Sequence, residues 1–327
     1  MAGVTIGAVI VLILVGGLVR MTGSGMGCPD WPKCFGQWVP PTDVSELPVD
    51  YKTRFQVAGK EISDFDAFKT WVEYLNRLVG VLIGFFTLLT AALSLRLRRE
   101  MPKVTALSVA ALFAVIVQGG IGAVVVRTNL HTGMITLHMI IALGINALLI
   151  WALLLSYRPL LGPVRGKSLP RKLKALAWAG VGVMLVQIVL GTQVREGVDE
   201  VAKAMGEAER ASWLAGLGTG YDLHSLFYYV VALMVGLLVW QIRPWLDKIP
   251  GTSLLLGGLL FSLVGEIALG LGMHHLGIPA WMQPLHLLGA TTLFATAFAL
   301  AGLFTLYRQV PHHEVDTIEN RVATLDV

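Results

Sequence analysis

Long apolar stretches alternate with short polar segments along nearly the whole chain. A membrane-spanning helix needs about 20 predominantly apolar residues. Eight stretches meet this requirement, at roughly 3–21, 69–95, 104–126, 132–155, 173–194, 217–241, 252–273 and 281–306. They are too long and too continuous for the strands of a membrane barrel, which alternate apolar and polar residues over about ten positions. The pattern therefore predicts an all-α polytopic membrane protein with eight transmembrane helices.

Composition and charge support a membrane protein. Of the 327 residues, 55% are hydrophobic and 14% are charged, whereas soluble proteins carry about 25% charged residues. Lys and Arg gather in the segments 96–103, 157–174 and 243–248, which the positive-inside rule places in the cytoplasm. With eight spans, both termini are then cytoplasmic in a multi-pass protein of the cell inner (plasma) membrane. The basic clusters are topology signals, so we expect membrane lipid as a partner and exclude nucleic acid.

The first apolar segment has no basic residues before it, so we expect a retained helix rather than a cleaved signal peptide. The topology then places residues 21–68 on the outer side, and this segment contains Cys28 and Cys34. Two thiols six positions apart in a Pro-containing turn on the oxidising side favour a disulfide bond. A redox-active pair or a metal site is the alternative, although two thiols are too few ligands for a closed zinc site.

The second half of the sequence repeats features of the first. Gln118 and Glu266 each precede a histidine by 20 positions, and the two segments are offset by 148. The same offset places Asn76 on His224, in the second span of each half. One offset that serves two separate helix pairs indicates a duplicated unit. The sequence thus predicts two pseudosymmetric four-helix bundles.

This repeat divides the chain into four parts. We assign residues 1–156 to an N-terminal bundle with the outer loop 21–68, and residues 171–308 to a C-terminal bundle. Residues 157–170 are expected to be a cytoplasmic linker, and residues 309–327 a cytoplasmic tail in which His312 and His313 are solvated.

His224 and His286 are the strongest candidate ligands. Ionisable groups are costly within a span and usually face the bundle interior, where a single histidine is more often simply hydrogen-bonded. These two fall at similar depth in the second and fourth helices of one predicted bundle, where imidazoles from opposite helices form a bis-axial heme site. A bare transition metal usually binds more than two ligands, so heme is the favoured interpretation.

Other polar residues near the outer helix ends are weaker candidates. His131 lies about 10 Å from His138 along one helix, so it cannot oppose His138 on one iron but could contact a porphyrin edge. His274 and His275 are interpreted as surface residues, with contact to a heme edge as the alternative. Four arginines either extend to the membrane interface or pair with heme propionates: Arg20, Arg77, Arg127 and Arg195.

Two segments resemble the heme A synthase family, whose members convert heme O to heme A for terminal oxidases. "GGLVRMTGSGMGCPDWPKCFGQWVPP" (16–41) is similar to the family's first-helix and first-loop signature, and "EYLNR" (73–77) is similar to its Glu-x-x-His-Arg segment. The resemblance covers nearly the whole chain. It implies two four-helix bundles, with heme O bound as the substrate in the first and a resident heme b cofactor in the second.

The resemblance also implies roles for individual residues. His224 and His286 become the axial ligands of heme b, with Arg195 as a further cofactor contact, and His138 becomes an axial ligand of the substrate iron. Glu73 takes the place of the catalytic carboxylate. Cys28 and Cys34 take the place of the outer-loop disulfide, and the remaining substrate-site candidates are Asn76, Arg77, Arg20, Arg127 and His131.

Asn76 departs from the family pattern, which has a histidine three residues after the glutamate. The implied chemistry is oxidation of one porphyrin methyl to a formyl group, by successive hydroxylations and loss of water. Glu73 lies one turn from Asn76 and could accept a proton or stabilise positive charge at the methyl carbon. The alternative for Glu73 is an ion pair with Arg77 at i+4.

Two other functions fit part of the pattern. A diheme b-type electron-transfer protein explains the histidines, but it explains neither Glu73 nor a first half with a single histidine ligand. A heme exporter or chaperone is the third possibility. The favoured function requires heme O and an unidentified electron donor as partners, with heme O synthase and a second copy of the chain as further candidates.

Overall fold

The computed structural model describes residues 1–161 and 169–307, which form helices and no strand element within those ranges. In this part of the chain, eight helices are long and apolar enough to cross a membrane: α1 (Ala2–Met21), α3 (Ala67–Ser94), α4 (Pro102–Arg127), α5 (Thr132–Tyr157), α6 (Arg171–Met205), α8 (Thr219–Ile242), α9 (Thr252–His275) and α10 (Met282–Leu306). Two short helices, α2 (Tyr51–Arg54) and α7 (Trp213–Gly216), lie in the connections. The prediction of a multi-pass all-α membrane protein is confirmed.

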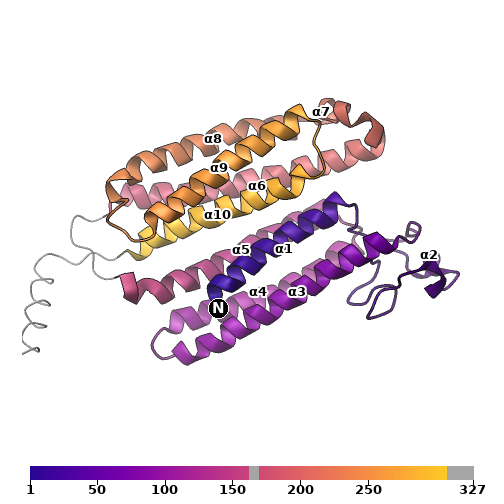
Figure 1. Cartoon of the computed structure of the whole chain (residues 1–327), viewed down its shortest axis with the longest axis horizontal. Helices are drawn as coiled ribbons and strands as arrows, with labels where there is room; N and C mark the ends of the chain where they lie inside the picture. The colour runs from indigo at the N-terminus through magenta and orange to yellow at the C-terminus, as the bar shows by residue number, and fades with distance from the viewer. Residues whose placement is uncertain (162–168, 308–327) are drawn as a thin grey trace, which may run out of the picture.

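The eight helices pack as two sets of four, drawn as the lower and upper layers of Figure 1. In the first set α3 packs on α1 and α4, and α5 packs on α4 and α1. In the second set α8 packs on α6 and α9, and α10 packs on α9 and α6. The second and fourth spans of each set therefore occupy opposite corners. This shared neighbour order is what a duplicated four-helix unit predicts.

Helix α10 lies at the centre of the molecule because it also packs on α1 and α5 of the other set. Of its most apolar window 56% is buried, against at most 33% for the other spans. Small residues permit the close approach of the helices. A Cβ on Gly302 would lie 2.7 Å from Leu154, and a Cβ on Gly17 of α1 would lie 2.9 Å from the Cβ of Pro284. The two sets thus meet around one helix.

The outward faces of the spans are apolar, as a lipid-facing surface requires. On α3 and α8 the exposed large side chains recur along one side, and they include Leu78, Leu82, Phe85, Leu226, Leu233 and Trp240. Aliphatic and aromatic side chains at these positions would be costly in water. We therefore take the exposed faces of α3 and α8 as surfaces that contact acyl chains.

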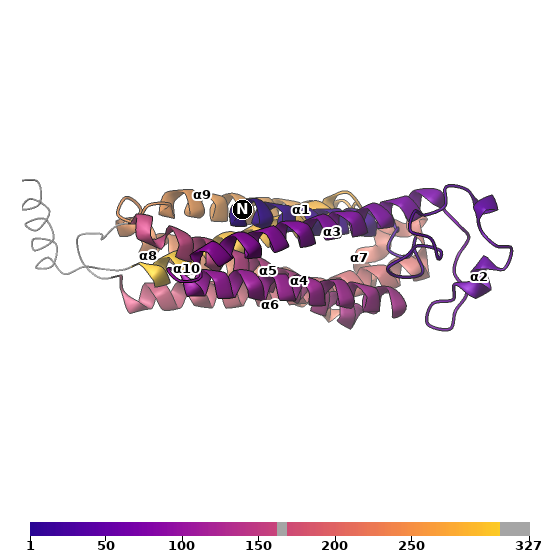
Figure 2. The same cartoon turned by 90° about the horizontal axis from the view of Figure 1, so that it is seen from below.

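The two ends of the helix array differ. The α3–α4 and α8–α9 connections, which carry basic residues, lie at one end, and the segment 22–66 with α2 projects beyond the helices at the other (Figures 1 and 2). Residues 162–168 of the predicted linker and the predicted tail 309–327, with His312 and His313, lie outside the described residues.

Helix α6 is longer than the apolar pattern predicted. The fifth span was expected to end at 194, but the helix continues to Met205 through a charged segment. Val198 on this extension is buried against Trp213 and Ile278. Apolar continuity predicted the part of the helix that can span a membrane, whereas this extension is stabilised by packing on the connections next to it.

Candidate functional site

The segment that follows α1 is folded around a disulfide bond between Cys28 and Cys34, as predicted. Both cysteines are fully buried, and they form a small apolar cluster with Phe35 and Tyr51. The carboxylate of Asp30 accepts hydrogen bonds from the backbone N–H groups of Phe35, at 2.6 Å, and of the following residue. The turn 28–36 is therefore stabilised by contacts within the segment itself, in addition to its contacts with the membrane helices.

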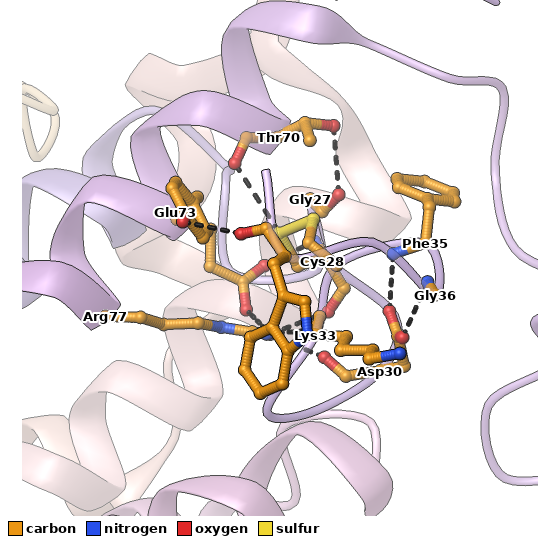
Figure 3. The surroundings of a disulfide bond; sticks show 12 residues. Gly27, Cys28, Asp30, Lys33, Phe35, Gly36, Thr70, Glu73 and Arg77 are labelled. Atoms are coloured by element: carbon orange, nitrogen blue, oxygen red, sulfur yellow. Dashed lines mark hydrogen bonds and ion pairs between the residues drawn. A yellow bond between two sulfur atoms is a disulfide. The ribbon is translucent and has the colours of Figure 1, made fainter. Parts of the chain in front are cut away.

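Glu73 on α3 points into this turn (Figure 3). Its Oε2 accepts a 2.7 Å hydrogen bond from the backbone N–H of Cys28, and its Oε1 forms an ion pair with Arg77 one turn further along α3. Only 4% of Glu73 is exposed. The ion pair at i+4, which the sequence allowed as the alternative for Glu73, is therefore formed.

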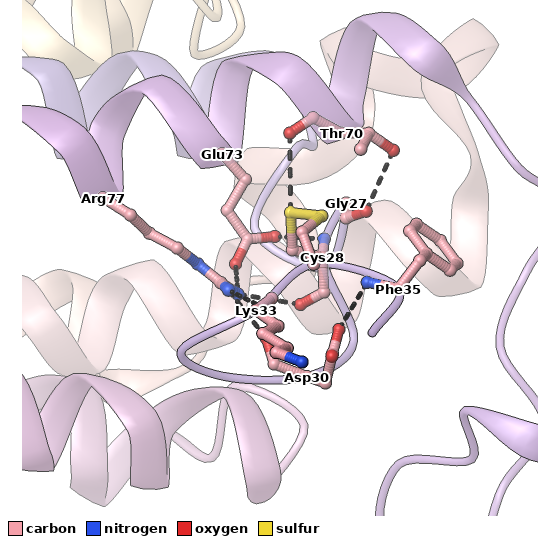
Figure 4. Close-up of polar contacts among 9 residues, drawn as sticks. Gly27, Cys28, Asp30, Lys33, Phe35, Thr70, Glu73 and Arg77 are labelled. Carbon is pink, nitrogen blue, oxygen red and sulfur yellow. Dashed lines mark hydrogen bonds and ion pairs between the residues drawn. A yellow bond between two sulfur atoms is a disulfide. The ribbon is translucent and has the colours of Figure 1, made fainter. Parts of the chain in front are cut away.

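Arg77 connects α3 to three carbonyl groups of the turn (Figure 4). Its guanidinium donates to the backbone oxygens of Asp30 at 2.6 Å, Lys33 at 2.9 Å and Cys28 at 2.9 Å. The guanidinium group has five N–H donors in a fixed planar arrangement, which suits such a set of acceptors. In this structure Arg77 therefore holds the disulfide turn against the helix, in addition to its ion pair with Glu73.

Gly27 allows the turn to approach α3 this closely. A Cβ at this position would lie 2.3 Å from the backbone oxygen of Lys69, a distance that no side chain can adopt. The backbone oxygen of Gly27 accepts a 3.0 Å hydrogen bond from the hydroxyl of Thr70. Backbone contact with α3 thus depends on the absence of a side chain at residue 27.

In the second half, His224 on α8 and His286 on α10 converge from opposite corners of the bundle. Their ring centres are 6.3 Å apart and the ring planes are inclined by 83°. A metal–imidazole bond is about 2 Å long and a ring nitrogen lies about 1.1 Å from its ring centre, so two rings on opposite sides of one iron have centres about 6.2 Å apart. The spacing of the two histidines therefore fits a bis-histidine heme iron.

Residues on α6 and α9 lie close to these two histidines. Gln187 on α6 donates a 3.2 Å hydrogen bond to the backbone oxygen of His224. Oε2 of Glu266 on α9 lies 3.2 Å from Nδ1 of His286, although without the alignment of a formed hydrogen bond. Gly191 on α6 faces His224 closely, since a Cβ there would lie 3.2 Å from the ring. Of these residues, Glu266 stands where a carboxyl group can hold a metal-binding imidazole in place.

The first half contains one histidine at the corresponding corner. His138 on α5 has a buried Nδ1 with no hydrogen-bond partner among the described residues, and Gly122 on α4 leaves room beside its ring. Gln118 donates a 2.8 Å hydrogen bond to the backbone oxygen of His138. Asn76 on α3, opposite α5, also has a buried side-chain oxygen that no described residue contacts by a hydrogen bond. These orphaned polar atoms are compatible with a ligand in the first bundle.

The remaining candidates lie in three different settings. Arg20 on α1 crosses to the second set, where it donates to Gln283 at 2.7 Å and to Asp199 at 2.8 Å. Nε of Arg195 lies 3.8 Å from Asp199 and has no hydrogen-bond partner among the described residues. Arg127 and His131 are exposed. Nδ1 of His274 forms a 2.6 Å hydrogen bond with the hydroxyl of Tyr221.

Residues 1–298 match the sequence model of the COX15-CtaA family, described as cytochrome oxidase assembly proteins. The chain belongs to this family. The match includes both four-helix sets and the disulfide turn.

Relatives of similar length carry the name heme A synthase. The protein of Methylobacterium nodulans is 28% identical over 338 aligned residues, covering 92% of this chain and 90% of that protein. The protein of Shewanella oneidensis is 24% identical, covering 90% and 92%, and that of Nitrosomonas eutropha is 26% identical, covering 88% of each. This member of the COX15-CtaA family therefore resembles these proteins along almost its full length.

Several residues of the site were not found from the sequence of this family member. The spacing of 20 positions before a histidine marked Gln118 and Glu266 as repeat positions, but it did not show that they contact that histidine. Gly27 and Asp30 lie in the segment that resembles the family's first loop, but their contacts were not expected, because a glycine and an aspartate in a Pro-containing turn are ordinary turn residues. Gln187 lacks a counterpart in the repeat and became visible only through its contact with His224.

Proposed function

We propose that the protein is a heme A synthase, an oxidoreductase that converts a porphyrin methyl of heme O to a formyl group. Family membership and the names of its relatives support this proposal. The observation that carries it is the inequality of the two halves. The second half brings two imidazoles to a spacing that fits one iron, whereas the first offers one histidine, His138, and a buried carboxylate, Glu73, on the helix of the opposite corner.

The second half would hold heme b as a resident cofactor. His224 and His286 would be its axial ligands, and Arg195, whose Nε is free of hydrogen bonds within the described residues, would pair with a propionate. Bound heme b supplies one-electron redox chemistry. Glu266 would help to orient the imidazole of His286, and the protein excludes water from the Nδ1 atoms of both rings.

The first half would bind heme O as the substrate. His138 would bind the iron, and Asn76 would lie on the opposite side. Glu73 is the only carboxylate within the first four spans. Each oxygen of a carboxylate can accept two hydrogen bonds, so Glu73 retains acceptor capacity beyond its contacts with Cys28 and Arg77. It would accept a proton or stabilise positive charge as the methyl carbon is oxidised.

The orientation in the plasma membrane follows from two further inferences. Basic connections at one end of the helices are expected in the cytoplasm, with both chain termini on that side. The disulfide turn at the other end would face the oxidising outer side, because disulfides persist there and not in the cytoplasm. Glu73 and the first-half site would then lie near the outer membrane surface.

Pigment analysis tests the proposed activity. Cells that contain a heme O source, but no other heme A synthase, are transformed with the wild-type chain, and the extracted hemes are separated by chromatography. The expected result is a new formyl porphyrin with the mass of heme A. Membranes with only hemes B and O would contradict the proposal and favour a diheme electron carrier or a heme-transporting protein.

A further inference from the structure

The two halves hold their candidate iron sites with different side chains at equivalent positions. The offset of 148 pairs His138 with His286 and Asn76 with His224. The helices that carry them occupy opposite corners in both sets, α3 with α5 and α8 with α10. Where the second half presents two imidazoles 6.3 Å apart, the first presents one imidazole and one carboxamide.

A carboxamide at position 76 does not replace a histidine as an iron ligand. The protein ligands of heme iron are imidazole, thiolate, thioether and phenolate groups. Asn76 is nevertheless kept inside the protein: its Oδ1 is buried and has no hydrogen-bond partner among the described residues. A buried amide without a partner is costly, so a group that binds between α3 and α5 would complete its contacts.

The residues that contact the two equivalent histidines, His138 and His286, also differ between the halves. Gln118 and Glu266 are equivalent in the repeat. Gln118 spends its amide N–H on the backbone oxygen of His138, which leaves the Nδ1 of that ring without a partner. The carboxyl group of Glu266 lies 3.2 Å from Nδ1 of His286, which likewise has no formed hydrogen bond within the described residues. Carboxyl groups placed behind metal-binding histidines fix the ring and strengthen it as a ligand.

We propose that Asn76 makes the two heme sites differ in the number of histidine ligands on the iron and in how readily the heme leaves. The first bundle holds its heme iron through His138 alone, with the position opposite it open to an exogenous ligand, and this heme enters and leaves. The second bundle retains its heme through His224 and His286. This inference rests on the proposed function for the identity of the first heme, a heme O substrate, but it concerns ligation and not turnover.

The test uses the purified full-length protein in lipid nanodiscs, loaded with excess heme O and then freed of unbound heme. Carbon monoxide binds ferrous heme only where an axial position is open. The expected wild-type result is two hemes per chain, one low-spin and one high-spin, with about one CO bound per two hemes. Asn76→His should give two low-spin hemes and no CO binding.

The repeat supplies the matched control. His224→Asn recreates in the second bundle the arrangement of the first, and both hemes of this variant should then bind CO. Transfer to excess apomyoglobin measures exchange, and Asn76→His should slow loss of the faster heme by at least about tenfold. Heme content and mass before transfer show whether each variant is folded and loaded.

Three results would overturn the inference: two low-spin hemes in the wild type, CO binding that Asn76→His leaves unchanged, or loss of both wild-type hemes to apomyoglobin at one rate. The outcome is separable from that of the proposed function. The expected CO pattern without heme A formation would refute the synthase activity and leave the unequal ligation standing. Heme A formation by a protein with two low-spin hemes would support the synthase activity and refute the unequal ligation.

Discussion

The backbone N–H of Cys28 donates a 2.7 Å hydrogen bond to the carboxylate of Glu73, across 45 positions of sequence. Arg77 closes the arrangement, since it donates to the backbone oxygen of Cys28 and pairs with Glu73. A buried charge pair on α3 is thus part of the attachment of the disulfide turn. Changes to the proposed catalytic carboxylate must therefore be separated from changes to the turn.

Glu73→Gln is expected to keep heme binding and to stop heme A formation, because the amide oxygen still accepts from Cys28 while charge and basicity are lost. Arg77→Gln provides the comparison, since it leaves Glu73 buried without its partner. Loss of one partner of a buried pair costs about 3–5 kcal/mol, so Arg77→Gln should lower the thermal stability strongly. Thermal unfolding of both variants measures the stability, and pigment analysis measures heme A formation.

Lys69→Gln is the control for removal of a charge from the same helix. Lys69 lies 3.9 Å from Asp66 and both side chains are well exposed, so this change should cost at most about 1 kcal/mol. A structural role for Glu73 predicts a different pattern: Glu73→Gln would then produce near-normal heme A in proportion to folded protein.

Gly27→Ala is expected to detach the disulfide turn from α3. The new methyl group would meet the backbone oxygen of Lys69 at 2.3 Å, and backbone cannot yield as a side chain can. Limited proteolysis should cleave the segment 22–66 of this variant faster, and heme A yield should fall although no proposed reacting group is altered.

Gly25→Ala is the matched control for Gly27→Ala. Its nearest neighbour is the flexible end of Leu130 at 3.1 Å, so the side chain can move aside. Equal protease sensitivity of the two variants would show that the approach at residue 27 does not hold the turn.

His224→Ala and His286→Ala are each expected to weaken the binding of heme b and to shift its optical spectrum, because a site built for two imidazoles then offers one. Heme content of purified protein and its optical spectrum make the measurement. His275→Ala, an exposed histidine near the outer end of α9, should keep both. Unchanged heme in the two single variants would refute the axial assignment.

Replacement of Cys28 and Cys34 by serine should lower stability by roughly 2–3 kcal/mol, as expected for a short disulfide-closed loop. The mutated turn would hold Cys28 N–H less firmly against Glu73, so substrate loading should fall more than the rate of the loaded protein. Alkylation of the wild type with and without reductant checks the bond by mass. Two thiols that react before reduction would contradict it.

Much of the fold could be predicted because a span must present continuous apolar length to lipid. The same reasoning says nothing of residues 195–205, where α6 continues through charged positions to pack Val198 on Trp213. The convergence of His224 and His286 could be expected from their helices, because the second and fourth spans of a four-helix set lie at opposite corners.

The contacts of the arginines could not be predicted in this way. An arginine at an outer helix end has the same local sequence signal whether it meets lipid headgroups, a propionate or backbone carbonyls. Arg77 binds three carbonyls because the turn 28–34 is folded back onto α3, and Arg20 reaches Asp199 because α1 lies beside α10. Both partner sets depend on tertiary placement and not on the residues that flank the arginine.

The central position of α10 also bears on the origin of the two halves. A dimer of identical subunits uses one surface twice, so a symmetric precursor would pack its fourth helix on the partner's first helix in both directions. In this chain α10 packs on α1 far more extensively than α5 packs on α6. Equivalence has been lost, and the single polypeptide is in effect a heterodimer.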